Sequence, residues 1–326
     1  MSDSAAAAHG GRTLAGRSEL SLGIAGTTLA VTAWGASSVV AKIIDMGALA
    51  LIAYRFVLFA IVMTAVLRAR RIPITRSHMR HSIWGGVTLG IDAGLFFTAV
   101  KFTTVANATI INALQIVIVS AVSARLYGER MPRRDIGYAA LAMVGVAVVA
   151  IESSSSDNWS LGGDLAAIGA LFGWSAYFIA TRQARDKVDA QQYTVCVAIY
   201  VGLMNLPLAA IFGQDLSWPT GESWMWLVVM AFGSGVLGHT AMNWSLRHVP
   251  LWLASTLTLL IPVVASGLAW LIFDESLSVL QMVAIAVVVA ALTMIVRNQS
   301  RPRIGGVPAA ESGPAAAAGR SGSTAT

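Results

Sequence analysis

Long apolar stretches separated by short polar joints run along nearly the whole chain. Each stretch approaches the roughly 20 residues that a helix needs to cross a hydrocarbon layer about 30 Å thick. Backbone groups in lipid must be hydrogen-bonded within their own segment, so these stretches are predicted to be helices. The pattern therefore predicts an all-α integral membrane protein with ten transmembrane helices, at residues 21–42, 48–67, 82–101, 105–125, 135–151, 161–181, 192–212, 223–245, 251–273 and 279–296.

The composition favours lipid over water as the main surroundings. Hydrophobic residues make up 56% of the 326 residues and charged residues 12%, whereas a typical soluble domain is about 25% charged. The lipid bilayer is therefore an expected partner. The single cysteine, Cys196, excludes an intrachain disulfide and suits a small buried apolar role. The sequence contains no cluster of metal ligands, so neither a metal site nor a cofactor is predicted.

Both ends of the chain lack the apolar periodicity of a packed segment. Residues 1–20 are rich in Ala, Gly and Ser and contain no apolar core of a signal peptide. Residues 297–326 are again rich in Arg, Pro, Gly, Ala and Ser. Both segments are predicted to be disordered cytoplasmic tails.

The distribution of Lys and Arg predicts the orientation of the helices, because cytoplasmic loops retain these residues and translocated loops lack them. With both termini inside, 19 of the 22 basic residues fall on the cytoplasmic side, whereas Lys42 and Lys101 fall on the other and Arg55 lies within the second span. The net charge of +6 is thus a topology signal, and no nucleic-acid partner is predicted. We expect a multi-pass protein of the cell membrane, that is, the plasma or inner membrane.

A sequence repeat divides the chain into two halves, residues 21–151 and 161–296. A shift of 140 residues places Trp34 on Trp174, and a shift of 146 superimposes Ala108 on Ala254, Leu114 on Leu260, Ser120 on Ser266 and Glu129 on Glu275. Five spans per half is an odd number, so the second half enters the membrane upside down relative to the first. Many secondary transporters are built this way, with the ligand site near the midplane between the halves.

Several local motifs recur at positions typical of one family. They are Trp34-Gly-Ala-Ser37, Tyr54-Arg-Phe56, Gly128-Glu-Arg-Met131, and Pro262 with Asp274-Glu-Ser-Leu277. Together they resemble the EamA family of the drug/metabolite transporter superfamily, from about residue 22 to residue 296. The resemblance implies two EamA-like five-helix repeats and transport of small organic solutes such as amino acids, other metabolites or drugs. The first half departs from the pattern at Ile116, which stands where the second half has Pro262, and this predicts a straighter fourth span.

Two charged residues lie deep within predicted spans. Arg55 is about eight residues, or roughly 12 Å, into its helix. It either recognises an anionic group such as a carboxylate or is a structural arginine that bonds to backbone carbonyls or snorkels outward to the membrane interface. Asp92, with Phe96 one turn further along the same face, either holds a substrate ammonium or neutralises Arg55. Asp92 is also the candidate for proton coupling, since a carboxylic acid removed from water holds its proton more readily.

The remaining candidates for solute binding are polar and aromatic residues at corresponding depths of the two halves. His239 falls one place beyond Asp92 under the 146-residue shift, and Asn243 follows it one turn later. Each is either a solute or proton-relay group or a polar group satisfied by a neighbouring helix. Trp34 with Ser37 and Trp174 with Tyr177 each place an aromatic ring and a hydroxyl on one helix face, at corresponding places of the two halves. These pairs are predicted to line a cavity. The full set of predicted substrate-binding residues is Trp34, Ser37, Tyr54, Arg55, Asp92, Phe96, Asn112, Trp174, Tyr177, His239 and Asn243.

Other polar and small residues are predicted to be structural. Gln115 and Asn205 suit hydrogen bonds between helices, and Gly169 with Gly173 matches a small-residue spacing that lets helices approach closely. Glu129 and Glu275 lie at membrane exits, where capping of the next helix or loop contacts are expected.

These features favour a secondary transporter, or permease, that moves a small metabolite by alternating access. The expected solute is an amino acid or a related zwitterion or anion. No Gly-x-x-x-x-Gly-Lys motif is present, so ATP is not expected as a direct partner. An enzyme is not predicted, because the nearest aspartyl pattern, Leu161-Gly-Gly-Asp164, lacks its first glycine. A structural or receptor-like bundle remains the alternative, and the oligomeric state is open between monomer and homodimer.

Overall fold

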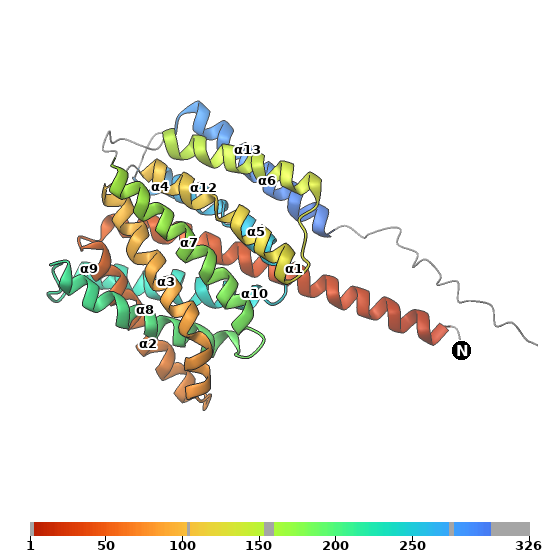
Figure 1. Cartoon of the computed structure of the whole chain (residues 1–326), viewed down its shortest axis with the longest axis horizontal. Coiled ribbons are helices and arrows are strands. Elements are labelled where there is room, and N and C mark those ends of the chain that lie inside the picture. The colour runs from red at the N-terminus through yellow and green to blue at the C-terminus, as the bar shows by residue number, and fades with distance from the viewer. Residues whose placement is uncertain (1–2, 103–104, 153–159, 274–276, 301–326) are drawn as a thin grey trace, which may run out of the picture.

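The chain folds into a bundle of helices, described here from a computed structural model for residues 3–102, 105–152, 160–273 and 277–300. These residues contain helices and no strand (Figure 1). The helices are α1 (Asp3–Ile43), α2 (Ala48–Ala69), α3 (Arg76–Phe102), α4 (Val105–Ala113), α5 (Gln115–Leu126), α6 (Arg133–Glu152), α7 (Leu161–Ala184), α8 (Ala190–Ile211), α9 (Gly221–Met230), the π-helix η1 (Ala231–His239), α10 (Thr240–Ser245), α11 (Leu251–Leu257), α12 (Leu260–Phe273) and α13 (Val279–Ser300).

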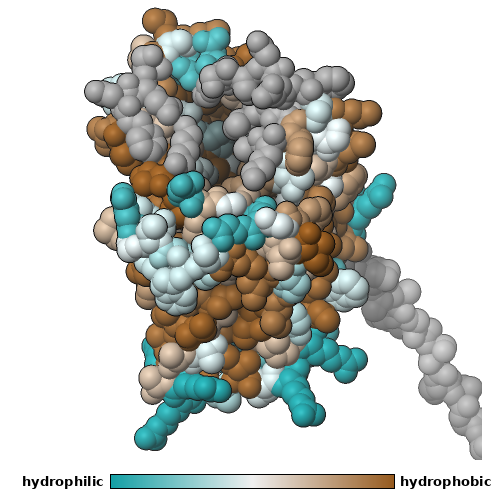
Figure 2. Space-filling view, turned by 90° about the vertical axis from the view of Figure 1, so that its left-hand side faces the viewer, coloured by the Kyte–Doolittle hydropathy of each residue, from teal (hydrophilic) through white to brown (hydrophobic). Residues whose placement is uncertain are grey.

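The prediction of ten membrane-spanning helices is confirmed. Within the described residues, ten helical stretches are long and apolar enough to cross a membrane. Three of them, the fourth, eighth and ninth, are built from more than one helical segment. Figure 2 shows brown hydrophobic side chains across the middle of one face, with teal hydrophilic side chains toward its lower end. That arrangement is expected of a protein whose sides face lipid and whose ends face water.

The N-terminal segment differs from the disordered tail predicted for residues 1–20. Helix α1 begins at Asp3 and continues without a break to Ile43, and Figure 1 shows its first part extending beyond the bundle. The run Ala5–Ala8 explains the helix locally, because alanine has the highest intrinsic helix propensity. Residues 301–326, in the predicted C-terminal tail, lie outside the described residues.

The two halves pack mainly against each other rather than each around its own core. Helix α2 packs along α8, and α3 packs along both α7 and α8, so the first half interlocks with the second. Helix α1 contacts η1 and α12 of the second half. Helices α6 and α13 form a separate pair on one side of the bundle (Figure 1). The centre of the molecule is therefore an interface between the two repeats.

The fourth and ninth spans are both interrupted near their middle, and the prediction that the fourth span is the straighter of the two stays a prediction. Helix α4 ends at Ala113 and α5 begins at Gln115, while α11 ends at Leu257 and α12 begins at Leu260. Pro262 supplies no amide hydrogen in the ninth span, which explains that break. The two breaks are joined by Gln115, at the start of α5, whose Nε2 donates to the carbonyl of Ser255 in α11 at 3.3 Å. Discontinuous helices that meet at the repeat interface are typical of secondary transporters.

The eighth span contains a π-helical segment that ends at its predicted site residue. The π-helical segment η1 ends at His239, and α10 follows directly. Gly238 allows the close approach of a neighbouring ring, because a Cβ atom there would lie 3.0 Å from Nε1 of Trp34. π-Helical turns are rare and frequently mark functional sites.

The α3–α7 contact supports a prediction about stability. A Cβ atom on Gly173 would lie 3.0 Å from the backbone nitrogen of Asp92 and 3.1 Å from its Cα, so a side chain there must push two helices apart. Gly173→Val is expected to destabilise the protein by about 1–3 kcal/mol, measured as a lower melting temperature in detergent. Gly162→Val is the matched control in the same helix, because nothing lies within 4 Å of a Cβ at that position. Equal melting temperatures for the two variants would contradict the packing described here.

Candidate functional site

Aromatic side chains from both halves surround His239. Its ring lies 5.1 Å from that of Trp34 and 5.7 Å from that of Phe56, measured between centroids. Trp34 also meets Trp174 edge-on at 5.3 Å. Trp34 and Phe56 belong to α1 and α2, whereas Trp174 and His239 belong to α7 and η1. The structure thus brings three predicted site residues, Trp34, Trp174 and His239, together at the interface between the repeats.

Arg55 and Asp92 are both buried, with 8% and 7% of their surface exposed. The pairing between them that the sequence left open is absent, since no ion pair or hydrogen bond among the described residues joins them. Nε of Arg55 and Oδ1 of Asp92 are buried without a hydrogen-bond partner. The Arg55 guanidinium lies 5.1 Å from the centre of the Phe56 ring, whereas Asp92 lies where α3 touches Gly173 of α7. The two ionisable side chains are therefore buried separately, one on α2 and one on α3.

Tyr177 connects His239 to a chain of buried polar groups. The Tyr177 hydroxyl lies 3.3 Å from Nδ1 of His239 and donates to Oδ1 of Asn243 at 2.9 Å. Nδ2 of Asn243 donates to Oγ1 of Thr194 at 2.8 Å. Sequence reasoning identified three of these four residues but missed Thr194, because one threonine in an apolar helix gives no distinctive pattern.

Ser37 and Trp34 bind the same residue of the second half. The indole nitrogen of Trp34 donates to the backbone carbonyl of Ser234 at 3.2 Å, and the hydroxyl groups of Ser234 and Ser37 are hydrogen-bonded to each other at 3.0 Å. These bonds hold α1 against η1. Ser37 and the indole nitrogen of Trp34 thus fasten the halves together, while the face of the Trp34 ring remains part of the aromatic group.

Three predicted site residues lie away from the central group. Tyr54 is half-buried, donates to the Leu216 carbonyl at 2.9 Å and packs edge-on against Trp224. Phe96 packs against a small apolar cluster and against Phe97. Asn112 is half-buried near the break between α4 and α5. Position along a helix did not reveal which way these side chains turn.

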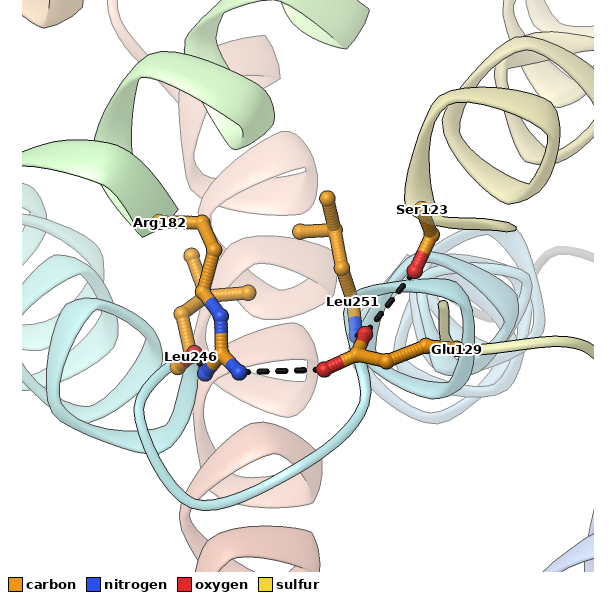
Figure 3. A network of polar contacts seen from close by, with 5 residues as sticks. All are labelled: Ser123, Glu129, Arg182, Leu246 and Leu251. Atoms are coloured by element: carbon orange, nitrogen blue, oxygen red, sulfur yellow. Dashed lines mark hydrogen bonds and ion pairs between the residues drawn. The ribbon is translucent and has the colours of Figure 1, made fainter. Parts of the chain in front are cut away.

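Glu129 forms a polar network that joins the halves at one end of the bundle (Figure 3). Its carboxylate pairs with Nη2 of Arg182 at 3.0 Å and accepts from the Ser123 hydroxyl and the Leu251 backbone nitrogen, both at 2.8 Å. Arg182 also donates to the Leu246 carbonyl. The sequence predicts capping of the next helix or loop contacts. The structure instead shows Glu129 accepting from the first residue of α11 in the other half. Its counterpart Glu275 lies outside the described residues.

Tyr127 covers the same network. The guanidinium of Arg182 lies 5.5 Å from the centre of the Tyr127 ring. Burial raises the pKa of the Tyr127 hydroxyl above its ordinary value, and the charge of Arg182 acts in the opposite direction. The Glu129–Arg182 pair is thus shielded on one side, which strengthens an ion pair relative to one in open water.

Ten apolar spans, two interlocked halves and a buried polar group between them define a multi-pass membrane transporter. The chain belongs to the EamA-like transporter family, which matches residues 21–151 and 161–297. The resemblance inferred from the sequence motifs is thereby confirmed.

Curated relatives agree with this class. The chain is 25% identical over 279 residues to a probable amino-acid metabolite efflux pump of Salmonella typhimurium, covering 81% of this chain and 91% of that protein. It is 24% identical to the Escherichia coli protein of the same description, with the same coverage. It is also 24% identical to the uncharacterized transporter YyaM of Bacillus subtilis, covering 74% of this chain and 82% of the relative.

A solved crystal structure shares the fold. It superimposes with a TM-score of 0.72 at 21% sequence identity and covers 87% of this chain and 99% of its own. The family and the relatives agree that the chain is a membrane-embedded transporter of a small metabolite.

Proposed function

We propose that this protein exports an amino acid or a related small zwitterion by alternating access, with the solute bound at the centre of the repeat interface. The observation that carries the proposal is the pair of buried, separately held charges, Arg55 and Asp92, with unpartnered polar atoms. The descriptions of two relatives as probable amino-acid metabolite efflux pumps support the same class of solute.

The physical reason is the cost of leaving a charge unpaired away from water. A buried ion without a partner is strongly unfavourable, whereas a buried ion with hydrogen bonds and a counter-charge is tolerated. A zwitterion supplies both missing partners, since its carboxylate matches the guanidinium of Arg55 and its ammonium matches the carboxylate of Asp92. The aromatic rings of Trp34 and Trp174 then form apolar walls for the rest of the solute.

The topology assigned to this transporter follows from its basic residues. Both termini and the Glu129–Arg182 network lie on the cytoplasmic side of the cell membrane. No nucleotide or nucleic acid takes part, and the drive is a gradient of protons or of another solute. The Glu129 network holds the cytoplasmic ends of the two halves together.

This assignment leads to a prediction about access from the cytoplasm. Glu129→Gln removes the charge that binds Arg182, so the cytoplasmic ends are expected to separate more often. The reporter is Ser120→Cys in a Cys196→Ser background. Ser120 lies one turn deeper on α5 than Ser123, which binds Glu129, and its hydroxyl is buried. Its cysteine should react several-fold faster in Glu129→Gln than without that substitution, with a maleimide applied from the cytoplasmic side. Glu222→Gln, an exposed glutamate at the start of α9, is the control. Unchanged labelling in Glu129→Gln would show that the network does not close this end.

The function is tested by flux measurements with purified protein. Metabolites released by cells with and without the protein are first compared, and the enriched amines and acids are then tested in liposomes at controlled pH. Accumulation of a zwitterionic metabolite that depends on an imposed gradient is the expected result. Gradient-driven flux confined to uncharged solutes would overturn the proposal.

A further inference from the structure

The hydrogen bonds beside His239 form a chain that ends at a backbone carbonyl. Oγ1 of Thr194 donates to the Ala190 carbonyl at 2.6 Å, and it lies 2.8 Å from Nδ2 of Asn243. Oδ1 of Asn243 lies 2.9 Å from the Tyr177 hydroxyl, which lies 3.3 Å from Nδ1 of His239. Tyr177, Asn243 and Thr194 have at most 1% of their surface exposed, so water does not compete for these bonds.

The carbonyl at the end gives the chain a direction. A carbonyl oxygen only accepts hydrogen bonds, and a hydroxyl group has a single hydrogen to donate. Thr194 uses its hydrogen on the Ala190 carbonyl, so toward Asn243 it acts as an acceptor. The NH2 group of Asn243 therefore faces Thr194, and the amide oxygen faces Tyr177. Since that oxygen cannot donate, Tyr177 donates its only hydrogen to Asn243.

The opposite orientation of the Asn243 amide would break the chain. Its oxygen would then face Thr194, whose one hydrogen would have to serve two acceptors. Either the contact of Thr194 with the Ala190 carbonyl or its contact with Asn243 would then have no hydrogen. A buried polar group without a partner is costly. The observed distances are consistent with a single direction of donation.

We infer that this chain of hydrogen bonds fixes the tautomer of His239. Nδ1 carries the hydrogen and donates it to the Tyr177 hydroxyl, so Nε2 presents its lone pair to the solute. Tyr177 is then a positioning residue, and His239 is a specificity-determining residue that accepts a hydrogen bond from an N–H donor. Among the described residues Nε2 makes no hydrogen bond.

The surroundings of the ring indicate the class of donor, and this step rests on the proposed function. The Phe56 ring lies between the two groups, with its centre 5.7 Å from that of the His239 ring and 5.1 Å from the Arg55 guanidinium. That guanidinium suits a carboxylate. A primary ammonium has three hydrogens to donate, so it can bind the carboxylate of Asp92 and also donate to Nε2. A solute with such an ammonium and a carboxylate for Arg55 has the pattern of an amino acid.

Nitrogen NMR tests the tautomer without measuring transport. Protein labelled with 15N in its histidine rings is placed in lipid nanodiscs, and the signals of His239 are assigned by their loss in His239→Gln. The neutral ring is expected to show a protonated Nδ1 and a bare Nε2. Thr194→Val removes the donor to the Ala190 carbonyl and frees the Asn243 amide to turn, so signals of both tautomers are expected.

Thr27→Val is the matched control for Thr194→Val. Thr27 is fully buried and donates to the carbonyl four residues earlier, that of Gly23, at 2.9 Å, but it takes no part in the chain. Its spectrum should match that of the unaltered protein. A hydrogen on Nε2 in the unaltered protein, or the same spectrum for both threonine variants, would overturn the inference.

Two substitutions of the ring test the acceptor role. His239→Gln can place an amide oxygen near the position of Nε2, whereas His239→Asn can reach only the position of Nδ1. The KM for a transported primary amine is expected to rise several-fold less in His239→Gln than in His239→Asn, and equal values would refute the role of Nε2. If the ring shows the predicted tautomer but no zwitterion is transported, the proposed function is refuted and the tautomer stands. If zwitterions are transported but the ring shows the other tautomer, the tautomer is refuted and the proposed function stands.

Discussion

Arg55→Ala is expected to abolish transport of zwitterionic and anionic solutes while the protein still inserts and folds. A hydrogen bond to a charged group contributes about 1.5–3 kcal/mol, which corresponds to a loss of roughly 10- to 150-fold in affinity. The second bond of a bidentate guanidinium–carboxylate contact would add to this loss. Because no hydrogen bond or ion pair of Arg55 is present among the described residues, its removal leaves no partner unsatisfied. The melting temperature should therefore not fall.

Two further variants separate charge from geometry. Arg55→Lys keeps the positive charge but lacks the planar fork, so it should retain partial activity with a raised KM. Arg68→Ala alters an exposed arginine of the same helix and should transport at the unaltered rate. Uptake of the zwitterion into liposomes measures all three variants. Unaltered uptake by Arg55→Ala would make Arg55 a structural residue.

The sequence predicts the membrane-spanning helices of this protein well, because each span satisfies its backbone hydrogen bonds locally and shows its apolar surroundings in its composition. The internal repeat also aligns Trp34 with Trp174, and these two residues meet in the folded chain. Two residues at equal places of an inverted repeat lie near the same axis, which explains why this alignment found a real contact.

Side-chain direction and partners across the halves could not be predicted in the same way. Tyr54 and Phe96 lie beside Arg55 and near Asp92 in sequence, yet they turn toward Trp224 and Phe97. Glu129 was expected to cap the next helix or to make loop contacts, and nothing in its own half indicated that it binds the backbone of Leu251 from the other half. Contacts of this kind depend on how two distant segments are rotated against each other, which periodicity within one segment does not encode.

The interrupted fourth span shows the same limit for backbone structure. The absence of proline at Ile116 gives no reason to expect an interruption in the fourth span, yet the break between α4 and α5 lies opposite the break in the ninth span. Gln115 binds both the carbonyl of Ser255 and the hydroxyl of Thr258 across the interface. A tertiary hydrogen bond thus accompanies a break for which the local sequence gives no signal.

Asp92→Asn is expected to lower both gradient-driven transport and solute exchange by more than roughly tenfold, since a charge-assisted hydrogen bond to the ammonium would be lost. The substitution keeps the shape of the side chain, and Oδ1 of Asp92 has no partner to lose, so folding should be preserved. Exchange of labelled for unlabelled solute and accumulation driven by a proton gradient are measured on the same liposomes.

The comparison of the two fluxes assigns the role of Asp92. Loss of both means that the carboxylate binds the solute, whereas loss of accumulation with exchange intact means that it carries the coupled proton. Asp135→Asn is the control, because that buried carboxylate binds Asn298 and Gln299 on the separate α6–α13 pair. It should lower the melting temperature and leave KM unchanged. If Asp92→Asn instead behaves like Asp135→Asn, Asp92 stabilises the fold, and the centre of the repeat interface does not bind the solute through this residue.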